Sequence, residues 1–308
     1  MVMYMANSII DEISMRTGIS ALQLSELVNN CENEYKKVRV VVNGKKRTFF
    51  IPSTHLKLIH YYIIQLLFSG VSVSSNAHAY IKKKSIKTNV LSHIGNRYFY
   101  QTDISSFFPS VTESMIRLCF ERRFGYLDKQ NIDFLVKAVA PFGHLDLGSP
   151  TSPYVSNIVL VEFDMKLSEE LSKLGSSIVY TRYSDDITIS SKTELDRKVD
   201  LIVERLLNQF GFKKNDKKTK FSTLKDKIKI TGLYLYNDGQ LTVGTKYKKK
   251  IRHYLHLARE NKERDFDNNQ ILGMLSFLRD IEPNYYQKLI LKYSDDKDSI
   301  IDILKEKK

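Results

Sequence analysis

The feature that most constrains this chain is a pair of adjacent acids, Asp185 and Asp186, set between two short β-like runs at 177–182 and 187–191. Neighbouring side chains of a regular strand point to opposite faces, so adjacent aspartates suit the turn of a β-hairpin. A third acid, Asp103, ends a separate run of apolar and aromatic residues about eighty positions upstream. The pattern therefore predicts a sheet in which the hairpin turn and the end of the upstream strand meet.

Three carboxylates placed in this way can hold two metal ions. In phosphoryl transfer one divalent ion activates the attacking hydroxyl and a second stabilises the leaving pyrophosphate, with the two ions roughly 3.5–4 Å apart. Magnesium suits this chemistry because it prefers oxygen ligands and takes only a few carboxylates from the protein. The structural alternative is that Asp favours turns for its own backbone hydrogen bonding, and the acids alone do not exclude it.

Net charge indicates the kind of partner. The 308 residues include 48 Lys plus Arg and 35 Asp plus Glu, a formal balance of +13. A polyanion, most simply nucleic acid, would bind such a chain, although a membrane surface would also attract it. No apolar run reaches the roughly 18 residues of a membrane span, so we expect no membrane association. The two cysteines provide neither a disulfide framework nor a zinc site, which suits a reducing cytoplasm.

Periodicity and turn residues predict an α+β chain. Residues 8–30 are expected to be helical with a break at Thr17-Gly18, and 38–50 to form a hairpin whose turn is Asn43-Gly44. The other expected helices are 54–69, 112–124, 129–139, 154–174 and 194–210; the other expected strands are 97–103, those within 227–236, and 240–243; the chain after about 246 is expected to be helical and basic.

Six motifs occur in a fixed order. They are RTFFIP at 47–52, DISSFFPSV at 103–111, GSPTSP at 148–153 with Asn157, YTRYSDD at 180–186, GFKKNDKKT at 211–219 and ITG at 230–232. Each is weak by itself. Together, at these spacings, the chain resembles the reverse transcriptases of bacterial retrons from about residue 36 to 293.

The resemblance implies a right-hand polymerase. An N-terminal helical segment at 1–35 would precede fingers at 36–95. The palm at 96–240 would be an antiparallel sheet with covering helices, and it would carry the catalytic YSDD hairpin. The basic residues from 241 to 308 would form a helical thumb.

The same resemblance assigns catalytic roles. Asp103, Asp185 and Asp186, with the carbonyl of Ile104, would bind two Mg²⁺ ions. Lys218 matches a lysine expected to protonate the departing pyrophosphate. The competing interpretation of Lys218 is phosphate binding, because five lysines lie between 213 and 220.

Nucleotide contacts follow from three motifs. Arg47, with Lys46 as its neighbour, would bind the triphosphate, since arginine can bind phosphate through two parallel hydrogen bonds. Phe108 resembles the steric gate that crowds a ribose 2′-hydroxyl, whereas Phe107 is expected in the core. Gly148, Ser149 and Pro150 would support the incoming nucleotide. The chain departs from the family at Leu147, where a glutamine is usual, so an amide expected near the nucleotide sugar is missing.

Two elements distinguish retron enzymes from other reverse transcriptases. The Asn-Ala-x-x-His element reads Asn89 to His93 here, with Val90 in place of Ala, and the Val-Thr-Gly triplet reads Ile230-Thr231-Gly232. The resemblance implies that both recognise the cognate RNA. A basic thumb helix carrying Lys246, Lys249, Lys250 and Arg252 would read the shape of an RNA stem-loop, although the same pattern suits any solvated amphipathic helix.

The resemblance finally implies an activity. The enzyme would use dNTPs to copy part of its structured noncoding RNA, msr-msd, into a short single-stranded DNA, msDNA, starting at the 2′-hydroxyl of an internal guanosine. It would act in the bacterial cytoplasm in antiphage defence, with a separate effector protein, since neither an effector nor an RNase H domain is expected within the chain. The alternatives are a reverse transcriptase of another lineage, such as a group II intron or other defence type, and a noncatalytic RNA-binding scaffold. The three intact acids argue against the scaffold.

Overall fold

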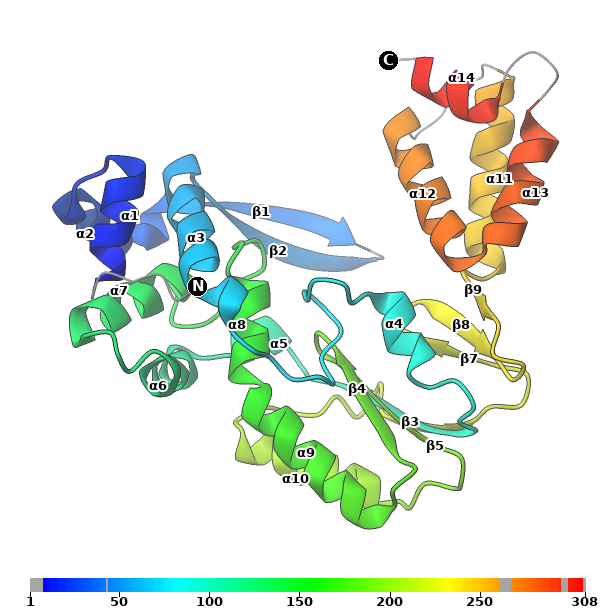
Figure 1. Ribbon diagram of the computed structural model, residues 1–308, viewed down its shortest axis with the longest axis horizontal. Coiled ribbons are helices and arrows are strands. Elements are labelled where there is room, and N and C mark those ends of the chain that lie inside the picture. Colours follow the sequence, from blue (N-terminus) through cyan, green and yellow to red (C-terminus); the bar gives the residue numbers. More distant parts are fainter. Residues whose placement is uncertain (1–7, 43, 261–266, 295–298, 307–308) are drawn as a thin grey trace. The chain divides into compact units, whose positions relative to one another are not determined.

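The computed structural model describes residues 8–42, 44–260, 267–294 and 299–306. Packing divides the chain into two compact units, and Figure 1 labels the helices and strands that they contain. Unit 1 comprises Met1–Lys84, Tyr100–Ile189 and Leu195–Phe221, and unit 2 comprises Ser85–Phe99, Ser190–Glu194 and Ser222–Lys308. This division follows internal packing and does not coincide with the fingers, palm and thumb boundaries, which stay a prediction.

Unit 1 begins with two short helices, α1 (Ile9–Thr17) and α2 (Ala21–Asn29). The Ser8 side chain accepts a hydrogen bond from the backbone N–H of Asp11, and Ser20 caps α2 in the same way. Gly18 ends α1 with φ of 72°, a left-handed conformation that glycine adopts without strain. The predicted helical segment and its break are confirmed.

The basic hairpin is a two-stranded antiparallel sheet of β1 (Tyr35–Val42) and β2 (Lys45–Pro52). Its register pairs Arg39 with Thr48 and Val40 with Arg47. The predicted hairpin is confirmed, and Asn43 of its predicted turn lies outside the described residues.

A helical group of unit 1 begins before the hairpin and continues after it. It contains η1 (Cys31–Glu34), α3 (Thr54–Leu66), η2 (Phe68–Gly70), α5 (Phe107–Ser110), α6 (Glu113–Arg123) and α7 (Lys129–Val139). Apolar faces at helical spacing, such as Leu56, Ile59 and Ile63 of α3, are fully buried. The helices predicted at 54–69, 112–124 and 129–139 are thus confirmed within a few residues.

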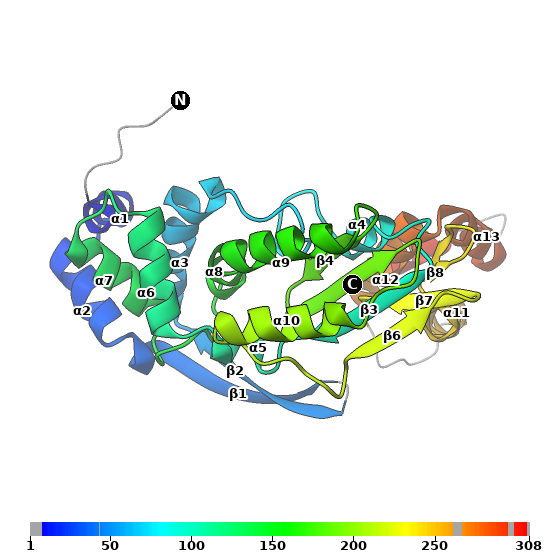
Figure 2. The same cartoon turned by 90° about the horizontal axis from the view of Figure 1, so that it is seen from below.

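The central sheet has the strand order β4-β5-β3-β6. The strands are β3 (Tyr98–Asp103), β4 (Val179–Tyr183), β5 (Asp186–Ser191) and β6 (Lys220–Thr223), and the last was not predicted. Helices α9 (Val161–Leu174) and α10 (Lys198–Gln209) run side by side next to these strands in Figures 1 and 2.

The single helix predicted at 154–174 is wrong. The structure has two helices there, α8 (Ser152–Val159) and α9, joined at Leu160. Leu160 leaves helical geometry with ψ of 2°, and its N–H donates to the carbonyls of Ser156 and Ile158. An apolar residue at this joint gives no sequence signal for the break.

Unit 2 packs a small sheet and a helix bundle around one apolar core. Its elements are α4 (Ile86–Leu91), β7 (Lys227–Ile230), β8 (Leu233–Tyr236), β9 (Leu241–Thr242), α11 (Thr245–Arg259), α12 (Asn268–Ile281), α13 (Pro283–Tyr293) and α14 (Ile300–Glu306). In Figure 1 α14 lies across the ends of the other bundle helices. Ile251, Tyr254, Leu255 and Ala258 form the buried face of α11, which confirms the predicted amphipathic helix.

None of the helices in the described ranges combines the length and the hydropathy that crossing a membrane requires.

Stability should depend on pH through His60. This side chain is fully buried on α3, with Nε2 2.9 Å from the carbonyl oxygen of Ala138, and burial lowers its pKa from 6.5 to about 4. As the pH falls, His60 is protonated in the unfolded chain before it is protonated in the folded chain. The contribution of His60 to the free energy of unfolding is therefore fully present above pH 6.5 and is lost as the pH drops toward 4. The loss should reach roughly 3 kcal/mol at the lower end.

Urea unfolding between pH 7.5 and 4.5 measures this loss. His60→Gln should flatten the pH dependence relative to the parent chain, whereas His55→Gln, an exposed position on the same helix, should leave it unchanged. Equal slopes for the parent and His60→Gln would refute the assignment.

Candidate active site

The structure places the three predicted acids together in unit 1. Asp103 is the last residue of β3, Asp185 lies in the two-residue turn after β4, and Asp186 begins β5. The backbone N–H of Ile104 donates to the carbonyl of Asp185 at 3.1 Å, which fixes the end of β3 beside the turn. The carbonyl of Asp103 accepts from the N–H of Asn215 at 3.0 Å. Asp103 is therefore held by backbone hydrogen bonds to both neighbouring segments.

Two of the acids, Asp185 and Asp186, lie in an environment that disfavours their negative charge. Burial raises the pKa of Asp186 to about 6, and the negative charge of Asp185 adds to the rise. Burial also raises the pKa of Asp185, with a further contribution from Asp103, while the positive charges of Lys218 and Arg47 oppose it. Partly buried carboxylates that repel one another would be stabilised by added positive charge.

Lys218 supplies one such charge. Its Nζ forms an ion pair with Oδ2 of Asp103, a side chain that is only 4% exposed. The hydrogen bond to Asp103 raises the pKa of the Lys218 ammonium, so this group stays protonated. The predicted catalytic lysine thus lies at the acids.

The donor set fits a divalent ion. Within the described ranges, no three His, Cys, Asp or Glu side chains are grouped to hold a metal ion as they stand, and the Lys218 ammonium lies at one oxygen of Asp103. The other oxygen, Oδ1, is buried and makes no hydrogen bond. A buried oxygen without a partner costs free energy, and a hard cation is the kind of ligand that recovers it.

A buried ion pair supports the catalytic turn. Arg182 on β4 and Asp164 on α9 are both fully buried, and Arg182 Nη2 donates to Asp164 Oδ2 at 2.8 Å while Nε donates to Oδ1 at 2.9 Å. Tyr180 also donates its hydroxyl to Asp164, at 2.6 Å. Three donors on one carboxylate satisfy the buried charge.

The same guanidinium holds the turn itself. Arg182 Nη1 donates to the carbonyl of Ser184 at 3.1 Å and to Oδ1 of Asn157 on α8 at the same distance. Ser184 has a positive φ of 60°, an uncommon conformation for a residue with a side chain. Tyr80 donates its hydroxyl to the Ser184 Oγ at 3.2 Å. Arg182 therefore fixes the backbone that presents Asp185.

Sequence reasoning missed this pair. Arg182 is part of the YTRYSDD motif, and Asp164 lies in the first turn of α9. The available signal was a charged residue inside the short β-like run VYTRY. Its partner could not be found from sequence because the two residues are brought together only by the packing of α9 on the sheet.

The Gly148 loop contacts the strand of the basic hairpin directly. The N–H of Phe50 on β2 donates to the carbonyl of Leu147 at 2.7 Å. A Cβ at Gly148 would lie 2.3 Å from the carbonyl oxygen of Phe50, and Gly148 has φ of 130°. Only glycine allows this approach. Arg47 on the same strand is exposed, as is Lys46.

A buried acid fixes the loop from the other side. Asp146 is 2% exposed and accepts hydrogen bonds from the Ser149 N–H at 3.2 Å and hydroxyl at 2.7 Å. The Tyr35 hydroxyl lies 2.8 Å from the same Ser149 Oγ. Pro150 is half-buried. The predicted nucleotide-binding loop is thus attached to both strands of the basic hairpin.

The aromatic pair after Asp103 divides as the sequence suggested. Phe107 is 5% exposed and packs near Phe212, with ring centroids 6.3 Å apart. Phe108 is half-buried, with its centroid 5.4 Å from that of Phe107. Phe107 is therefore a core residue, and the gate role of Phe108 stays a prediction.

Three predicted RNA-binding residues are buried within unit 2, which corrects the expectation of direct contact. Asn89, His93 and Ile230 are at most 1% exposed. Asn89 Nδ2 donates to the Thr231 Oγ1 at 3.2 Å, and His93 Nδ1 lies 2.7 Å from the Ser190 Oγ. Two of these side chains contact the β7–β8 turn and the end of β5, and any part they play in RNA recognition stays a prediction.

The remaining predicted RNA contacts are accessible. Thr231 is half-buried with φ of 43°, and Gly232 is exposed. Exposed side chains on α11 include Lys246, Lys249, Lys250 and Arg252.

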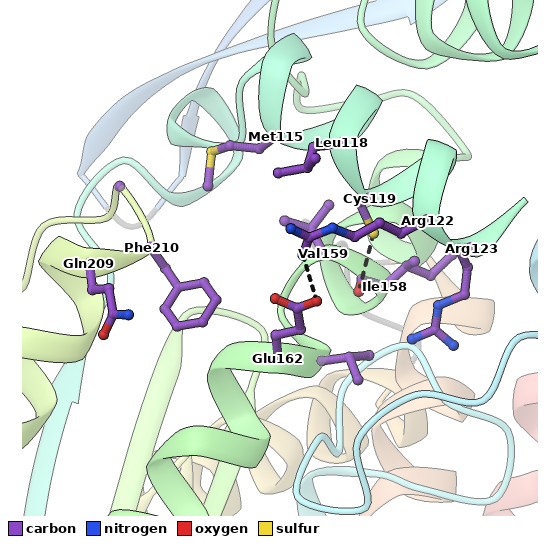
Figure 3. Close-up of a pocket in the computed structure, with 12 residues that line it drawn as sticks. Met115, Leu118, Cys119, Arg122, Arg123, Ile158, Val159, Glu162, Gln209 and Phe210 are labelled. Atoms are coloured by element: carbon purple, nitrogen blue, oxygen red, sulfur yellow. Dashed lines mark hydrogen bonds and ion pairs between the residues drawn. The ribbon is translucent and has the colours of Figure 1, made fainter. Parts of the chain in front are cut away.

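A pocket of about 640 Å³ lies elsewhere on unit 1, between α6, the α8–α9 joint and the end of α10 (Figure 3). Its lining includes Met115, Cys119 and Phe210, and an ion pair of 2.9 Å joins Arg122 to Glu162 beside it. None of the predicted site residues lines it, so this pocket is not the catalytic site.

Comparison with known proteins identifies the family. The profile described as "Reverse transcriptase (RNA-dependent DNA polymerase)" matches residues 32–235. The retron Ec73 reverse transcriptase of Escherichia coli is 33% identical over 305 residues, covering 93% of this chain and 94% of that protein. The chain belongs to the retron reverse transcriptases. It is therefore an RNA-directed DNA polymerase with the right-hand polymerase fold.

Two other retron reverse transcriptases are similar at lower identity. That of retron Ec86 from Escherichia coli is 26% identical and covers 91% of this chain and 86% of its own length. That of retron Mx65 from Myxococcus xanthus is 27% identical and covers 80% of this chain and 61% of its own length. The part of the chain that matches the family profile, residues 32–235, contains Asp103, Asp185, Asp186 and Lys218.

The buried ion pair yields a stability prediction. Arg182→Met should lower the free energy of unfolding by roughly 3–5 kcal/mol, because it leaves the Asp164 carboxylate buried without its cation. The double variant Arg182→Met/Asp164→Leu should lose less than the sum of the two single changes. Urea unfolding followed by circular dichroism measures each value.

Arg205→Met is the matched control. Arg205 pairs with Glu170 at 2.9 Å on the surface, and such pairs contribute at most about 1 kcal/mol. The role given to the pair would be contradicted if the losses in the free energy of unfolding of Arg182→Met and Asp164→Leu were strictly additive. It would also be contradicted if Arg182→Met lost no more than Arg205→Met.

Proposed function

We propose that this reverse transcriptase copies part of its own structured noncoding RNA, msr-msd, into a short single-stranded DNA, msDNA, primed from the 2′-hydroxyl of an internal guanosine. The observation that carries the proposal is the meeting of Asp103, Asp185 and Asp186 beside Lys218 in a chain that aligns with a retron reverse transcriptase over nearly its whole length.

The acids are proposed to bind two Mg²⁺ ions. Asp103, Asp185, Asp186 and the Ile104 carbonyl would be the protein ligands, and the ions, when bound, would supply charge stabilisation to the attacking and leaving oxygens. The unpartnered Oδ1 of Asp103 and the raised pKa of Asp186 support this assignment. Lys218 would leave Asp103 as positive charge arrives, which frees its ammonium for the departing pyrophosphate.

The Gly148 loop and the basic hairpin are proposed to bind the dNTP. Arg47 and Lys46 would contact the triphosphate, and the effect of Arg47 on the pKa of Asp185 supports its proximity to the acids. Phe108 would exclude a ribose 2′-hydroxyl, and Gly148, Ser149 and Pro150 would support the nucleotide. Leu147 presents an apolar side chain where the family has an amide.

The cognate RNA is proposed to bind unit 2. Thr231 and Gly232 at the β7–β8 turn and the cations of α11, Lys246, Lys249, Lys250 and Arg252, would make contacts, while Asn89, His93 and Ile230 position the turn. The fingers, palm and thumb would keep the boundaries given by the motifs. We also propose a cytoplasmic role in bacterial antiphage defence together with a separate effector protein.

Removal of one catalytic carboxylate should abolish DNA synthesis. Asp185→Asn and Asp186→Asn remove a negative charge that would bind metal, so primer extension on an RNA template with Mg²⁺ should fall to background. RNA binding, measured by fluorescence anisotropy, should be largely intact. Asp196→Asn, an exposed acid before α10, should extend normally.

The same preparations test the product. Sequencing should find branched DNA joined to RNA with the parent chain and RNA alone with the two Asn variants. Undiminished extension by both variants would exclude the catalytic assignment, and active enzyme with unbranched DNA would point to another lineage.

Substitution of Lys218 distinguishes acid catalysis from charge alone. If Lys218 protonates pyrophosphate, both Lys218→Gln and Lys218→Arg should slow single-nucleotide incorporation roughly 10²–10⁴-fold, because arginine does not release its proton. Rapid-quench kinetics measures the step. Lys217→Gln and Lys217→Arg at the exposed neighbouring position are matched controls. Full activity of Lys218→Arg would show that only the positive charge matters.

A further inference from the structure

The β7–β8 hairpin has two faces of opposite character. Its register pairs Lys227 with Tyr236 and Lys229 with Tyr234 on one face. The alternate residues Ile228, Ile230, Leu233 and Leu235 are buried in the unit 2 core. We call Lys227, Lys229, Tyr234 and Tyr236 the Lys–Tyr face.

The four side chains form one continuous surface. Lys227 Nζ lies 5.5 Å from the ring centroid of Tyr234 and 5.7 Å from that of Tyr236. Lys229 Nζ lies 5.8 Å from the Tyr234 centroid. Both lysines are exposed and both tyrosines are half-buried. The ammonium groups therefore lie over the rings at a solvent-accessible surface.

The Tyr234 ring is held by the backbone next to it. A Cβ at Gly244 would lie 2.6 Å from Cε2 and 2.9 Å from Cδ2 of this ring, so the glycine leaves room that no other residue would leave. A ring that is already fixed loses little conformational entropy when a ligand stacks on it. The surface is thus preorganised at its central aromatic side chain.

Hairpin stability alone explains part of this arrangement, since a cross-strand pair contributes roughly 0.2–1 kcal/mol. The surface also matches the two requirements of an unpaired nucleic-acid strand, which are aromatic rings for base stacking and cations for the backbone. Lys225, exposed and two positions before Lys227, extends the row of cations. Asp226 and Asp238 are the exposed acids near the end of the hairpin.

Other polyanions fit less well. A duplex keeps its bases stacked internally and is recognised by shape and backbone, so it would leave the tyrosine rings unused. An acidic protein surface would pair with the lysines and would likewise make no use of the ring faces. The combination of rings and ammonium groups favours a strand with exposed bases.

We propose that the Lys–Tyr face binds an unpaired segment of the RNA that the enzyme copies. Bases stack on Tyr234 and Tyr236, and Lys227 and Lys229 turn from the rings to the phosphates. The assignment to RNA rests on the proposed function, whereas the binding surface itself is independent of catalysis.

Binding is measured with the full chain and three fluorescein-labelled probes: a 16-nucleotide single-stranded RNA, a 16-base-pair RNA duplex, and a single-stranded DNA of the RNA's sequence. Tyr234→Leu/Tyr236→Leu should weaken binding of the single-stranded RNA at least tenfold. Duplex binding should change less than twofold. Tyr234→Phe/Tyr236→Phe keeps the rings and should retain binding of the RNA strand.

The lysines are tested through salt. Lys227→Gln/Lys229→Gln should reduce the slope of log Kd against log salt by about 1.4 for the single strand. Lys288→Gln/Lys292→Gln on α13 removes the same charge from the same unit and should leave the slope nearly unchanged.

Three results would overturn the proposal: equal losses for single-stranded and duplex RNA in the Leu variant, equal losses in the Phe and Leu variants, or an effect on the DNA strand without one on the RNA strand. Thermal unfolding of each variant identifies any loss caused by misfolding, which the Phe variant avoids. Anisotropy requires no DNA synthesis, so failure of the polymerase assignment would be seen separately in primer extension.

Discussion

The turn that carries Asp185 depends on the buried contact between Arg182 and Asp164. The Arg182 guanidinium forms an ion pair with Asp164 on α9 and donates hydrogen bonds to Asn157 on α8 and to the carbonyl of Ser184. Both helices and the turn are therefore held by the same side chain. Because each charge would be costly to bury alone, the packing of α9 on the sheet and the position of the turn stabilise each other. The position of Asp185 is therefore tied to the packing of the unit.

The Gly148 loop of unit 1 is held by a different set of contacts. A backbone hydrogen bond joins the loop to β2, and a hydrogen bond between the hydroxyls of Ser149 and Tyr35 joins it to β1. Within the loop, Asp146 accepts a hydrogen bond from the Ser149 hydroxyl. These contacts join the loop to both strands of the basic hairpin. A triphosphate held by Arg47 and a nucleotide resting on the loop would thus be positioned by the same element.

The sequence predicted the parts whose signals are local. The hairpins, the amphipathic helices and the meeting of Asp103 with Asp185 and Asp186 followed from periodicity, turn residues and motif order. The α8–α9 break, Asp164 and Asp146 did not, because they depend on which residues become neighbours after packing. Asn89 was predicted to contact RNA, and only the structure shows that its side chain is buried and donates a hydrogen bond to Thr231.

The attachment of the Gly148 loop has a consequence for position 147. The loop is held by a hydrogen bond to the backbone carbonyl of residue 147, and any amino acid has this carbonyl. The close approach to Phe50 also requires that residue 148 has no side chain, and only glycine meets this requirement. The conformation of the loop therefore depends on Gly148 and on the backbone of residue 147, and not on the side chain of residue 147. Because the contact uses only the backbone of residue 147, the side chain at this position can be substituted without removing the hydrogen bond that holds the loop.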